Sequence, residues 1–303
     1  MKAHQYLQPA ALVVLICLMA GCASLSEGIS SVTGGKISAG DAESAVKVGK
    51  ALRNSFKDIT ESEEYYIGRA VAALIISRYP VYQNKSVTSY VNKIGNAVAV
   101  YSGRPEIYAG YHFLVLDTEE VNAVSAPGGF IFISKGLLKR CRNEEMLANI
   151  LAHEVGHVAA KHGLKSIRKS RLIDAFKVMG TEAVRKYGSQ ELAELTAIFE
   201  DVLSDIVEKL IERGYDRKYE YEADKLGLET AAGTGYDPRG MADFLQTMVD
   251  DAAGQSNKGW FRTHPSASDR LSRVNKKIKG IKSLPAEQKV RTSRYSAVMK
   301  SVR

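Results

Sequence analysis

The sequence is poor in cysteine, with only three in 303 residues. Two of them, Cys17 and Cys22, lie in or directly after an apolar segment at the N-terminus, which leaves Cys141 without a partner. We therefore expect no intramolecular disulfide, and a small scaffold held together by disulfide bridges is excluded. Cys141 belongs to no visible Cys–His pair, which favours a buried structural thiol over a nucleophile.

The sequence also shows no internal repeat, and its N-terminal apolar run is too short to cross a bilayer comfortably. This run, Ala10–Ala20, is typical of the core of a signal peptide. It leads into Met19-Ala20-Gly21-Cys22, which resembles the bacterial lipobox, in which the cysteine is lipidated. The alternative is an ordinary secretory signal that is cut near Ala20 or Ala23. We expect a signal peptide of the lipoprotein type over residues 1–21, because Cys22 stands where lipidation requires it.

Residues 22–44 are rich in serine and glycine and predict a flexible tether behind the lipidated Cys22. Residues 45–303 are enough for one sizeable core, and we expect them to form a single domain. The formal net charge of +8 would suit nucleic acid, but in an exported lipoprotein it favours anionic lipid headgroups instead. We expect the protein in the bacterial cell envelope, lipid-anchored and facing the periplasm. Ala23 is compatible with the outer membrane, and no oligomeric state is predicted.

The spacing of apolar residues predicts an α+β domain that is mostly helical. Aromatic and β-branched stretches at Tyr111–Leu116 and Phe130–Ile133 predict strands, separated by an extended piece and a turn in 121–129. A capping box at Thr60–Glu63 precedes the first helix, which is expected to end at Tyr79-Pro80. The other helices are expected at Val87–Val98, 143–161, 165–187, 189–213, 216–231, from Asp237-Pro238 onward, and lastly from about Ser266.

The segment His153-Glu154-Val155-Gly156-His157 has the H-E-x-x-H pattern and lies in the helix expected over residues 143–161, with Asn143 as its N-cap. Residues four apart share one face of a helix, so both imidazoles can bind a single zinc ion. Glu154 would take a proton from the water that the zinc activates. The alternative is two unrelated histidines beside a glutamate, but on a buried helix these groups are costly unless a metal satisfies them.

A catalytic zinc ion needs a third protein ligand. His162 follows His153 by nine residues and would lie on the opposite face if the helix continues. Ala160 and Gly163 stand where the longer H-E-x-x-H-x-x-G-x-x-H pattern needs glycine and histidine, so that class is excluded.

Glu220 and Asp224 are better candidates, since they are four residues apart on the helix expected over 216–231, while Glu222 points away from both. One carboxylate could bind zinc while the other accepts a hydrogen bond from a ligating imidazole. The alternative is an acidic, solvated helix face.

The H-E-x-x-H segment followed by Glu220–Asp224 resembles metallopeptidase family forty-eight, which includes HtpX, BepA, the mitochondrial Oma-type protease and the CAAX prenyl endopeptidases. The segment Asn122–Gly129 resembles the family's N-A-F-x-x-P-G-G motif, with Val124 in place of the aromatic residue. The resemblance covers most of the expected mature chain and implies a zincin-like fold of the gluzincin type, with a small β-sheet before the H-E-x-x-H helix. The further segments that carry it, in family order, are Tyr65–Ala70, Tyr90–Gly95, Asn122–Gly129, Thr263–Ser266 and Asp269-Arg270.

The resemblance also implies roles for individual residues. Glu220 would be the third zinc ligand, and Asp224 would support the site. His264 would be an extra, displaceable ligand or an oxyanion donor, and the alternative is a histidine that merely starts a helix. A strand edge near the metal would hold the substrate through main-chain hydrogen bonds. The resemblance places Asn122, Ala123, Gly128 and Gly129 on this edge.

The sequence thus predicts an endopeptidase with one zinc ion per chain, held by His153, His157 and Glu220, with Glu154 as the base. Expected substrates are misfolded or misassembled cell-envelope proteins, whereas nucleic acid and prenylated proteins are not expected. The alternative is a chaperone-like or binding lipoprotein with a latent, covered site. Residues 163–215 have an apolar stripe and could form a lid, although a core-facing helix pair is the simpler interpretation.

Overall fold

The computed structural model describes residues 60–165, 207–255, 260–264, 267–281 and 289–302, which all belong to one unit of the chain. The expected signal peptide and tether lie outside these residues, as does most of the segment 163–215. Among the described residues, no helix has the length and apolar character needed to cross a membrane.

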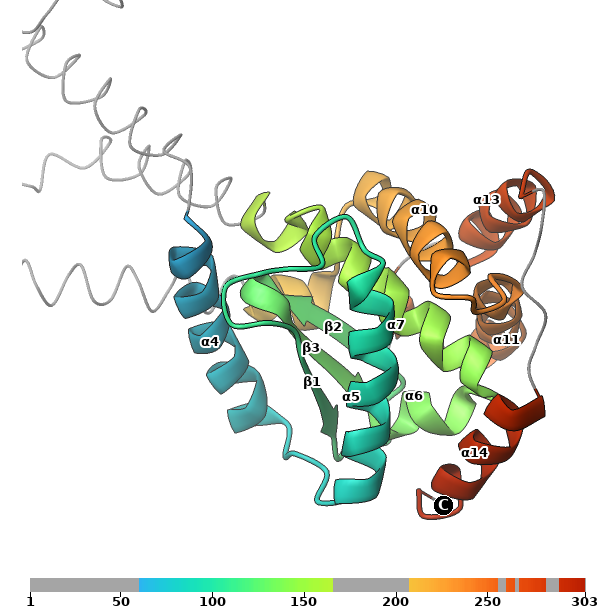
Figure 1. The fold of residues 1–303 in the computed structure, drawn as a ribbon, viewed down its shortest axis with the longest axis horizontal. Coiled ribbons are helices and arrows are strands. Elements are labelled where there is room, and N and C mark those ends of the chain that lie inside the picture. The colour runs from blue at the N-terminus through green and yellow to red at the C-terminus, as the bar shows by residue number, and fades with distance from the viewer. Residues whose placement is uncertain (1–59, 166–206, 256–259, 265–266, 282–288, 303) are drawn as a thin grey trace, which may run out of the picture. The chain divides into compact units, whose positions relative to one another are not determined.

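A sheet of three strands in the order β1-β3-β2 lies among the helices (Figure 1). β1 (His112–Leu116) is parallel to β3 (Phe130–Ser134), and β2 (Ala123–Ala126) is antiparallel to it. Both predicted strands are confirmed, and the predicted extended piece between them forms β2. The short helical turn η1 (Pro127–Gly129) links β2 to β3. Since β3 lies in the middle, β2 is an outer strand of the sheet.

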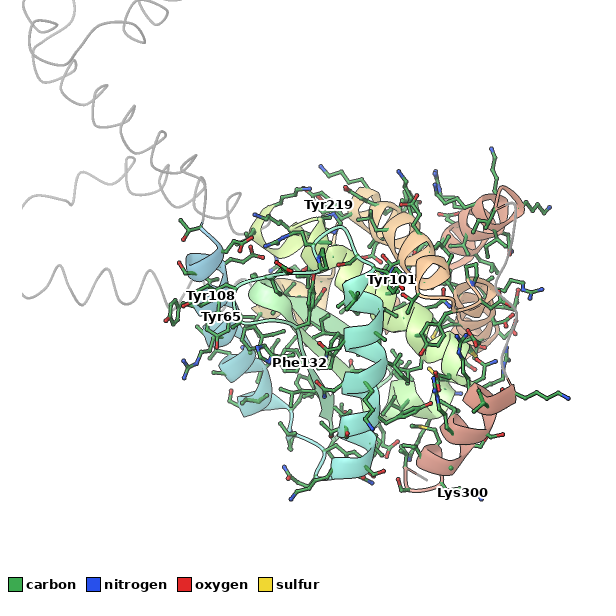
Figure 2. The ribbon with its side chains drawn as sticks, in the orientation of Figure 1. Tyr65, Tyr101, Tyr108, Phe132, Tyr219 and Lys300 are labelled. Carbon is green, nitrogen blue, oxygen red and sulfur yellow. The ribbon has the colours of Figure 1, made fainter. Side chains whose placement is uncertain are left out.

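Helices cover both faces of the sheet (Figure 1). α5 (Lys85–Val100) and α7 (Glu144–Ala159) pack on one face, where they share a buried apolar cluster with β1 and β3. α4 (Glu61–Arg78) and the short turn η2 (Lys209–Arg213) pack on the other, against side chains such as Phe132 (Figure 2). Because both faces are covered, β3 is apolar at nearly every position rather than at alternate ones. The predicted fold class, α+β and mostly helical, is confirmed.

α7 forms because its first turn is capped and its apolar residues recur on every side. The Asn143 side chain accepts a hydrogen bond from the Met146 N–H, so the predicted N-cap is confirmed. Glu144 and Glu145 follow in the first turn, where carboxylates interact favourably with the helix dipole. The helix is buried along its length and carries His153 and the rest of the H-E-x-x-H segment into the interior.

The described residues after β3 are mostly helical, and they contain more helices than the sequence predicted. α6 (Lys135–Arg140) and α12 (Trp260–Thr263) were not predicted. The helix near Ser266 is not the last, because α14 (Lys289–Met299) follows it. α14 was missed because few of its side chains are apolar and buried. The three helices that were predicted are α10 (Arg217–Gly233), α11 (Arg239–Gln255) and α13 (Ala267–Lys279).

Cys141 lies under α14, which explains its burial. The Tyr295 hydroxyl of α14 donates a hydrogen bond to the Cys141 carbonyl oxygen (2.9 Å). Burial raises the pKa of the Cys141 thiol, so the thiol stays protonated and unreactive. The prediction of a buried cysteine is confirmed.

A buried ionic cluster ties α14 to the start of α7. The Glu144 carboxylate accepts hydrogen bonds from the Arg294 guanidinium and from the hydroxyls of Tyr90 and Tyr236. Burial raises the pKa of Glu144, but these three partners together lower it below its usual value. The folded protein therefore holds Glu144 ionised, and α7 is fixed at its N-terminus.

Glu144→Gln tests this cluster, because it removes the charge but keeps the shape of the side chain. We expect the free energy of unfolding at pH 7 to fall by about 2–4 kcal/mol, since the charged hydrogen bonds are lost. The folded-state pKa of Glu144 lies below the unfolded value of 4.5, so the charge stabilises the fold fully above that pH. Its contribution is lost as the pH falls through the folded-state value. Urea unfolding of both proteins should therefore give a smaller difference at about pH 4 than at pH 7.

Glu229→Gln is the matched control, because the Glu229 side chain is 61% exposed. It should change the free energy of unfolding by less than about 0.5 kcal/mol. A difference between wild type and Glu144→Gln that does not vary with pH would contradict the proposed role of the charge.

Candidate metal centre

Four side chains from three parts of the chain converge on one buried point. His153 and His157 come from α7, Glu220 comes from the first turn of α10, and His264 directly follows α12. One ligand atom from each of the four lies within 4.8 Å of the others, and all four side chains are buried. The structure thus brings together the three predicted zinc ligands and His264.

The ring nitrogens and carboxylate oxygens of this group that could bind a metal lie close to one another. The Nε2 atoms of His153 and His157 are 3.1 Å apart. Glu220 Oε1 is 3.3 Å from His157 Nε2, and its Oε2 is 3.6 Å from His153 Nε2. Two imidazole nitrogens and a carboxylate oxygen are a donor set that zinc prefers.

The unsatisfied atoms of this group fit a cation. Both Glu154 carboxylate oxygens and Glu220 Oε1 are buried, and none of them has a hydrogen-bond partner among the described residues. Buried oxygens of this kind cost free energy unless something satisfies them. A divalent metal ion between His153, His157 and Glu220 would do so, with Glu154 beside it. The residues present therefore fit a metal ion such as zinc.

The charge states of two of the groups suit metal binding. Burial lowers the pKa of His157 to about 4, more than the Glu220 carboxylate raises it, so the imidazole is neutral at pH 7. Burial raises the pKa of Glu220, but the nearby charges of His264 and Arg270 lower it well below its usual value. A neutral imidazole and an ionised carboxylate are the forms that bind a metal.

Asp224 binds the outer side of His153. Its Oδ1 is 3.0 Å from His153 Nδ1, and the Arg270 guanidinium of α13 holds it through Nε (2.9 Å) and Nη2 (2.7 Å). Burial raises the pKa of Asp224, but Arg270 lowers it to about 2. Burial and Arg270 lower the pKa of His153, yet its bonds to Asp224 and Glu220 outweigh them and raise it to about 9. The Asp224 carboxylate thus orients the His153 ring so that Nε2 faces Glu220.

Arg270 is fully buried, and its place in a family motif indicated no role for it in the site. In addition to Asp224 it binds Glu220, since its Nη1 is 3.1 Å from Glu220 Oε2. One guanidinium therefore holds both Glu220 and Asp224. Only the tertiary structure brings α13 to this position, so spacing along the chain could not reveal the contact.

His162 is not where the sequence placed it. α7 ends at Ala159, and Lys161 has a φ of +56°, a left-handed conformation that stops the helix. His162 therefore turns back, and its Nδ1 lies 2.8 Å from the Nδ1 of His157. The opposite face was expected only if the helix continued, and α7 ends before it reaches His162.

His264 contacts protein groups through both ring nitrogens. Nδ1 is 2.8 Å from Glu220 Oε2, whereas Nε2 is 3.2 Å from the Ala123 carbonyl oxygen of β2 and 3.7 Å from Glu154 Oε1. Trp260 stacks on the His264 ring with 3.9 Å between the ring centroids. His264 therefore lies between the group of ligand atoms and the edge of the sheet.

The outward edge of β2 is covered by groups from the C-terminal half of the chain. The Asn122 carbonyl accepts a hydrogen bond from the Ser134 N–H of β3, so the carbonyls of the residues on either side of Asn122 point away from β3. The outward carbonyls accept hydrogen bonds as follows: Val121 from the Trp260 N–H, Ala123 from His264 Nε2, and Ser125 from the Tyr215 hydroxyl.

The four predicted edge residues separate into two pairs. Asn122 and Ala123 lie beside the site, where Asn122 Oδ1 accepts a hydrogen bond from the Thr263 hydroxyl. Gly128 and Gly129 lie farther along the chain in η1, buried beneath neighbouring elements, and both have a positive φ. The Gly128 N–H donates to a Glu64 oxygen of α4, so these glycines shape a turn.

Two glycines let α7 and α10 approach closely at the site. A Cβ on Gly227 would lie 3.0 Å from the His153 backbone, and one on Gly156 would lie 3.1 Å from the Ala223 carbonyl oxygen. Larger residues here would push α10, and with it Glu220, away from α7. The sequence analysis did not single out either glycine, because no local pattern marks a helix crossing.

The sequence model for peptidase family M48 matches residues 85–278 of the chain. The β-barrel assembly-enhancing protease of Escherichia coli K12 is 22% identical over 249 residues, which cover 80% of this chain and 50% of that protein. The mitochondrial metalloendopeptidase OMA1 of Schizosaccharomyces pombe is 27% identical, over 73% of this chain and 63% of that protein.

The human mitochondrial metalloendopeptidase OMA1 is 29% identical over 54% of this chain and 32% of its own length. The chain thus spans about half the length of the curated relatives that it matches first.

Gly227→Ala tests the helix crossing. In an unconstrained helix this change stabilises by about 1 kcal/mol, but here the new methyl group would meet the His153 backbone. We expect zinc affinity to fall about tenfold, because the carboxylates of α10 shift relative to His153. Competition with a chromophoric chelator measures the affinity.

Gly233→Ala, on the same helix, is the control, since its Cβ would meet nothing closer than the Tyr101 ring at 3.4 Å. It should leave zinc affinity unchanged. If the two variants bind zinc equally well, the crossing does not set the geometry of the site.

Proposed function

Because the chain belongs to peptidase family M48, we propose that it is a zinc-dependent endopeptidase. The observation that carries the proposal is the buried group of His153, His157 and Glu220 beside the unpaired carboxylate of Glu154. The same donor set without an adjacent carboxylate would suit a structural metal. With Glu154 present, the site has both a place for a Lewis acid and a base.

His153, His157 and Glu220 would hold one zinc ion, which supplies polarisation of a peptide carbonyl and activation of a water molecule when it is bound. Glu154 takes a proton from the attacking water on a carboxylate oxygen and delivers it to the nitrogen of the departing amine. Burial of Glu154 removes competing water from its oxygens, which favours this exchange. Asp224 keeps the His153 ring oriented throughout.

His264 is proposed to contact the substrate carbonyl. Its Nδ1 stays bound to Glu220, while its Nε2 faces β2 and lies 3.7 Å from a Glu154 oxygen. A peptide beside β2 would bring its own carbonyl close to this nitrogen, and a donor there would stabilise the negative charge that develops on the oxygen. Two roles were considered for His264, an extra zinc ligand and an oxyanion donor, and this proposal takes the second.

We propose that substrates are extended segments of misfolded or misassembled cell-envelope proteins. Main-chain hydrogen bonds to Ala123, on the outer strand β2, would hold such a segment with little regard to its sequence. Two similar bacterial proteins are named β-barrel assembly-enhancing proteases, which is consistent with this class of substrate.

A latent enzyme is the second candidate, and one observation favours it. The outward carbonyls of Val121, just before β2, and of Ala123 and Ser125 in β2 are already hydrogen-bonded by Trp260, His264 and Tyr215. A peptide that adds to this edge must therefore replace these contacts. In this reading the protein binds or protects other proteins, and cleavage needs a change that uncovers the edge.

We further propose that Cys22 carries lipid and anchors the protein in the cell envelope, facing the periplasm and most consistent with the outer membrane. The lipobox-like sequence Met19–Cys22 supports this proposal, as does the serine- and glycine-rich segment that follows it.

Glu154→Gln tests the mechanism. The variant keeps the shape of the side chain but cannot accept the proton, so we expect cleavage of unfolded casein by the zinc-loaded protein to fall at least about 100-fold. Elemental analysis should still find one zinc ion per chain in both proteins. Glu229→Gln, at an exposed position on α10, should cleave at the wild-type rate.

Equal cleavage by wild type and Glu154→Gln would reject the mechanism. The latent alternative is tested in cells that lack the gene. Full rescue of the deletion phenotype by Glu154→Gln favours a binding function, whereas failure to rescue favours the peptidase.

Cys22→Ser tests the anchor. The variant has no thiol to accept lipid, so we expect it in the soluble fraction, whereas the wild type stays with the membranes. Mass spectrometry of the mature N-terminus should find lipid on Cys22 of the wild type alone. A wild-type protein that is cut near Ala23 and carries no lipid would show an ordinary secretory signal instead.

A further inference from the structure

The two ligand histidines of α7 have different partners on their outer nitrogens. His153 Nδ1 faces the Asp224 carboxylate at 3.0 Å, the usual arrangement for a histidine that binds a metal. His157 Nδ1 faces another imidazole, that of His162, at 2.8 Å. The outer nitrogen of His162 in turn lies 3.3 Å from an Oε2 atom of Glu222 on α10.

If His157 binds a metal, only one arrangement of protons is possible along the hydrogen-bonded series His157–His162–Glu222. His157 Nε2 faces Glu220 and His153, so its proton must be on Nδ1. That N–H then donates to His162 Nδ1, which must be unprotonated to accept it. The proton of His162 is therefore on Nε2, from which it donates to the Glu222 carboxylate.

Packing holds His162 in this place. The left-handed residue Lys161 turns the chain back, and the His162 side chain is fully buried. The ring stacks on Tyr219, at the N-terminal end of α10 (Figure 2), with 4.4 Å between centroids. Tyr215 stacks in the same way on His157, also at 4.4 Å, so both imidazoles have a fixed plane.

We propose that His162 is a positioning residue, which links Glu222 to His157 and holds the His157 ring in the tautomer that binds zinc. This inference rests on the proposed function. Through His162, the ligand histidine His157 is linked to the Glu222 carboxylate, whereas His153 contacts the Asp224 carboxylate directly. Glu222, which shares no face with Glu220 and Asp224, thereby acquires a role at the outer end of the chain of hydrogen bonds.

Two substitutions of His162 separate hydrogen bonding from packing. His162→Asn keeps an oxygen where Nδ1 now lies, so it can still accept the proton of His157. His162→Leu fills a similar volume but offers no acceptor. Glu222→Gln keeps an acceptor but removes the charge, and Glu229→Gln on the same helix is the exposed control.

The first measurement is zinc affinity by chelator competition, with every variant carrying Glu154→Gln so that no self-cleavage occurs. We expect His162→Leu to weaken binding about 10- to 100-fold, and His162→Asn and Glu222→Gln to stay within about threefold of the parent. The control Glu229→Gln should not differ from the parent. Thermal unfolding in EDTA shows whether each variant is folded without metal.

The second measurement needs no zinc. Long-range ¹H–¹⁵N NMR of the metal-free protein reports which ring nitrogen carries the proton. We expect the proton on Nδ1 of His157 and on Nε2 of His162. The reverse pattern, with His162 Nδ1 as the donor, overturns the proposal even if His162→Leu fails to fold.

The outcomes separate this proposal from the proposed function. Equal weakening by His162→Asn and His162→Leu means that His162 only fills space, and no weakening by either means that it does not support His157. Both results overturn the positioning role but leave the peptidase intact. A wild-type chain that binds no zinc rejects both.

Discussion

The backbone of α10 approaches α7 at Gly227, and this contact determines where two carboxylates meet two histidines. Glu220 is one turn ahead of Asp224 on α10, so a single close crossing lets the first face His157 while the second binds the outer side of His153. A shift of α10 along α7 would disrupt both contacts together. The candidate metal centre is therefore a property of a helix pair rather than of the H-E-x-x-H segment alone.

Burial of so many charges requires support from the C-terminal helices. Arg270 of α13 is fully buried and is paired with Glu220 and Asp224 of α10, whose charges would otherwise repel each other in a medium of low dielectric constant. Arg294 of α14 does the same for Glu144 at the start of α7. Removing one member of such a cluster leaves a buried charge without a partner. The arginines of α13 and α14 are therefore needed to stabilise the buried carboxylates.

The sequence predicted what local pattern determines. The helix around His153, the strands β1 and β3, and the N-cap Asn143 follow from periodicity and capping, and the structure confirms them. Glu220 was found because two motifs at a distance resembled one family. α14 and the position of His162 were missed for physical reasons. α14 buries few apolar side chains, and one left-handed residue, Lys161, ends a helix that apolar spacing alone would continue.

The hydrogen bonds on the outer edge of β2 also affect whether this edge can pair with strands of other proteins. An exposed strand edge pairs readily with other strands, and a protein with the proposed function would meet many unfolded chains. The carbonyls of Val121, Ala123 and Ser125 are already hydrogen-bonded within the protein. Strands of other chains therefore cannot pair with this edge unless they displace those bonds. Under the proposed function, the three contacts that a substrate would displace thus also protect the protein from coaggregation with its substrates.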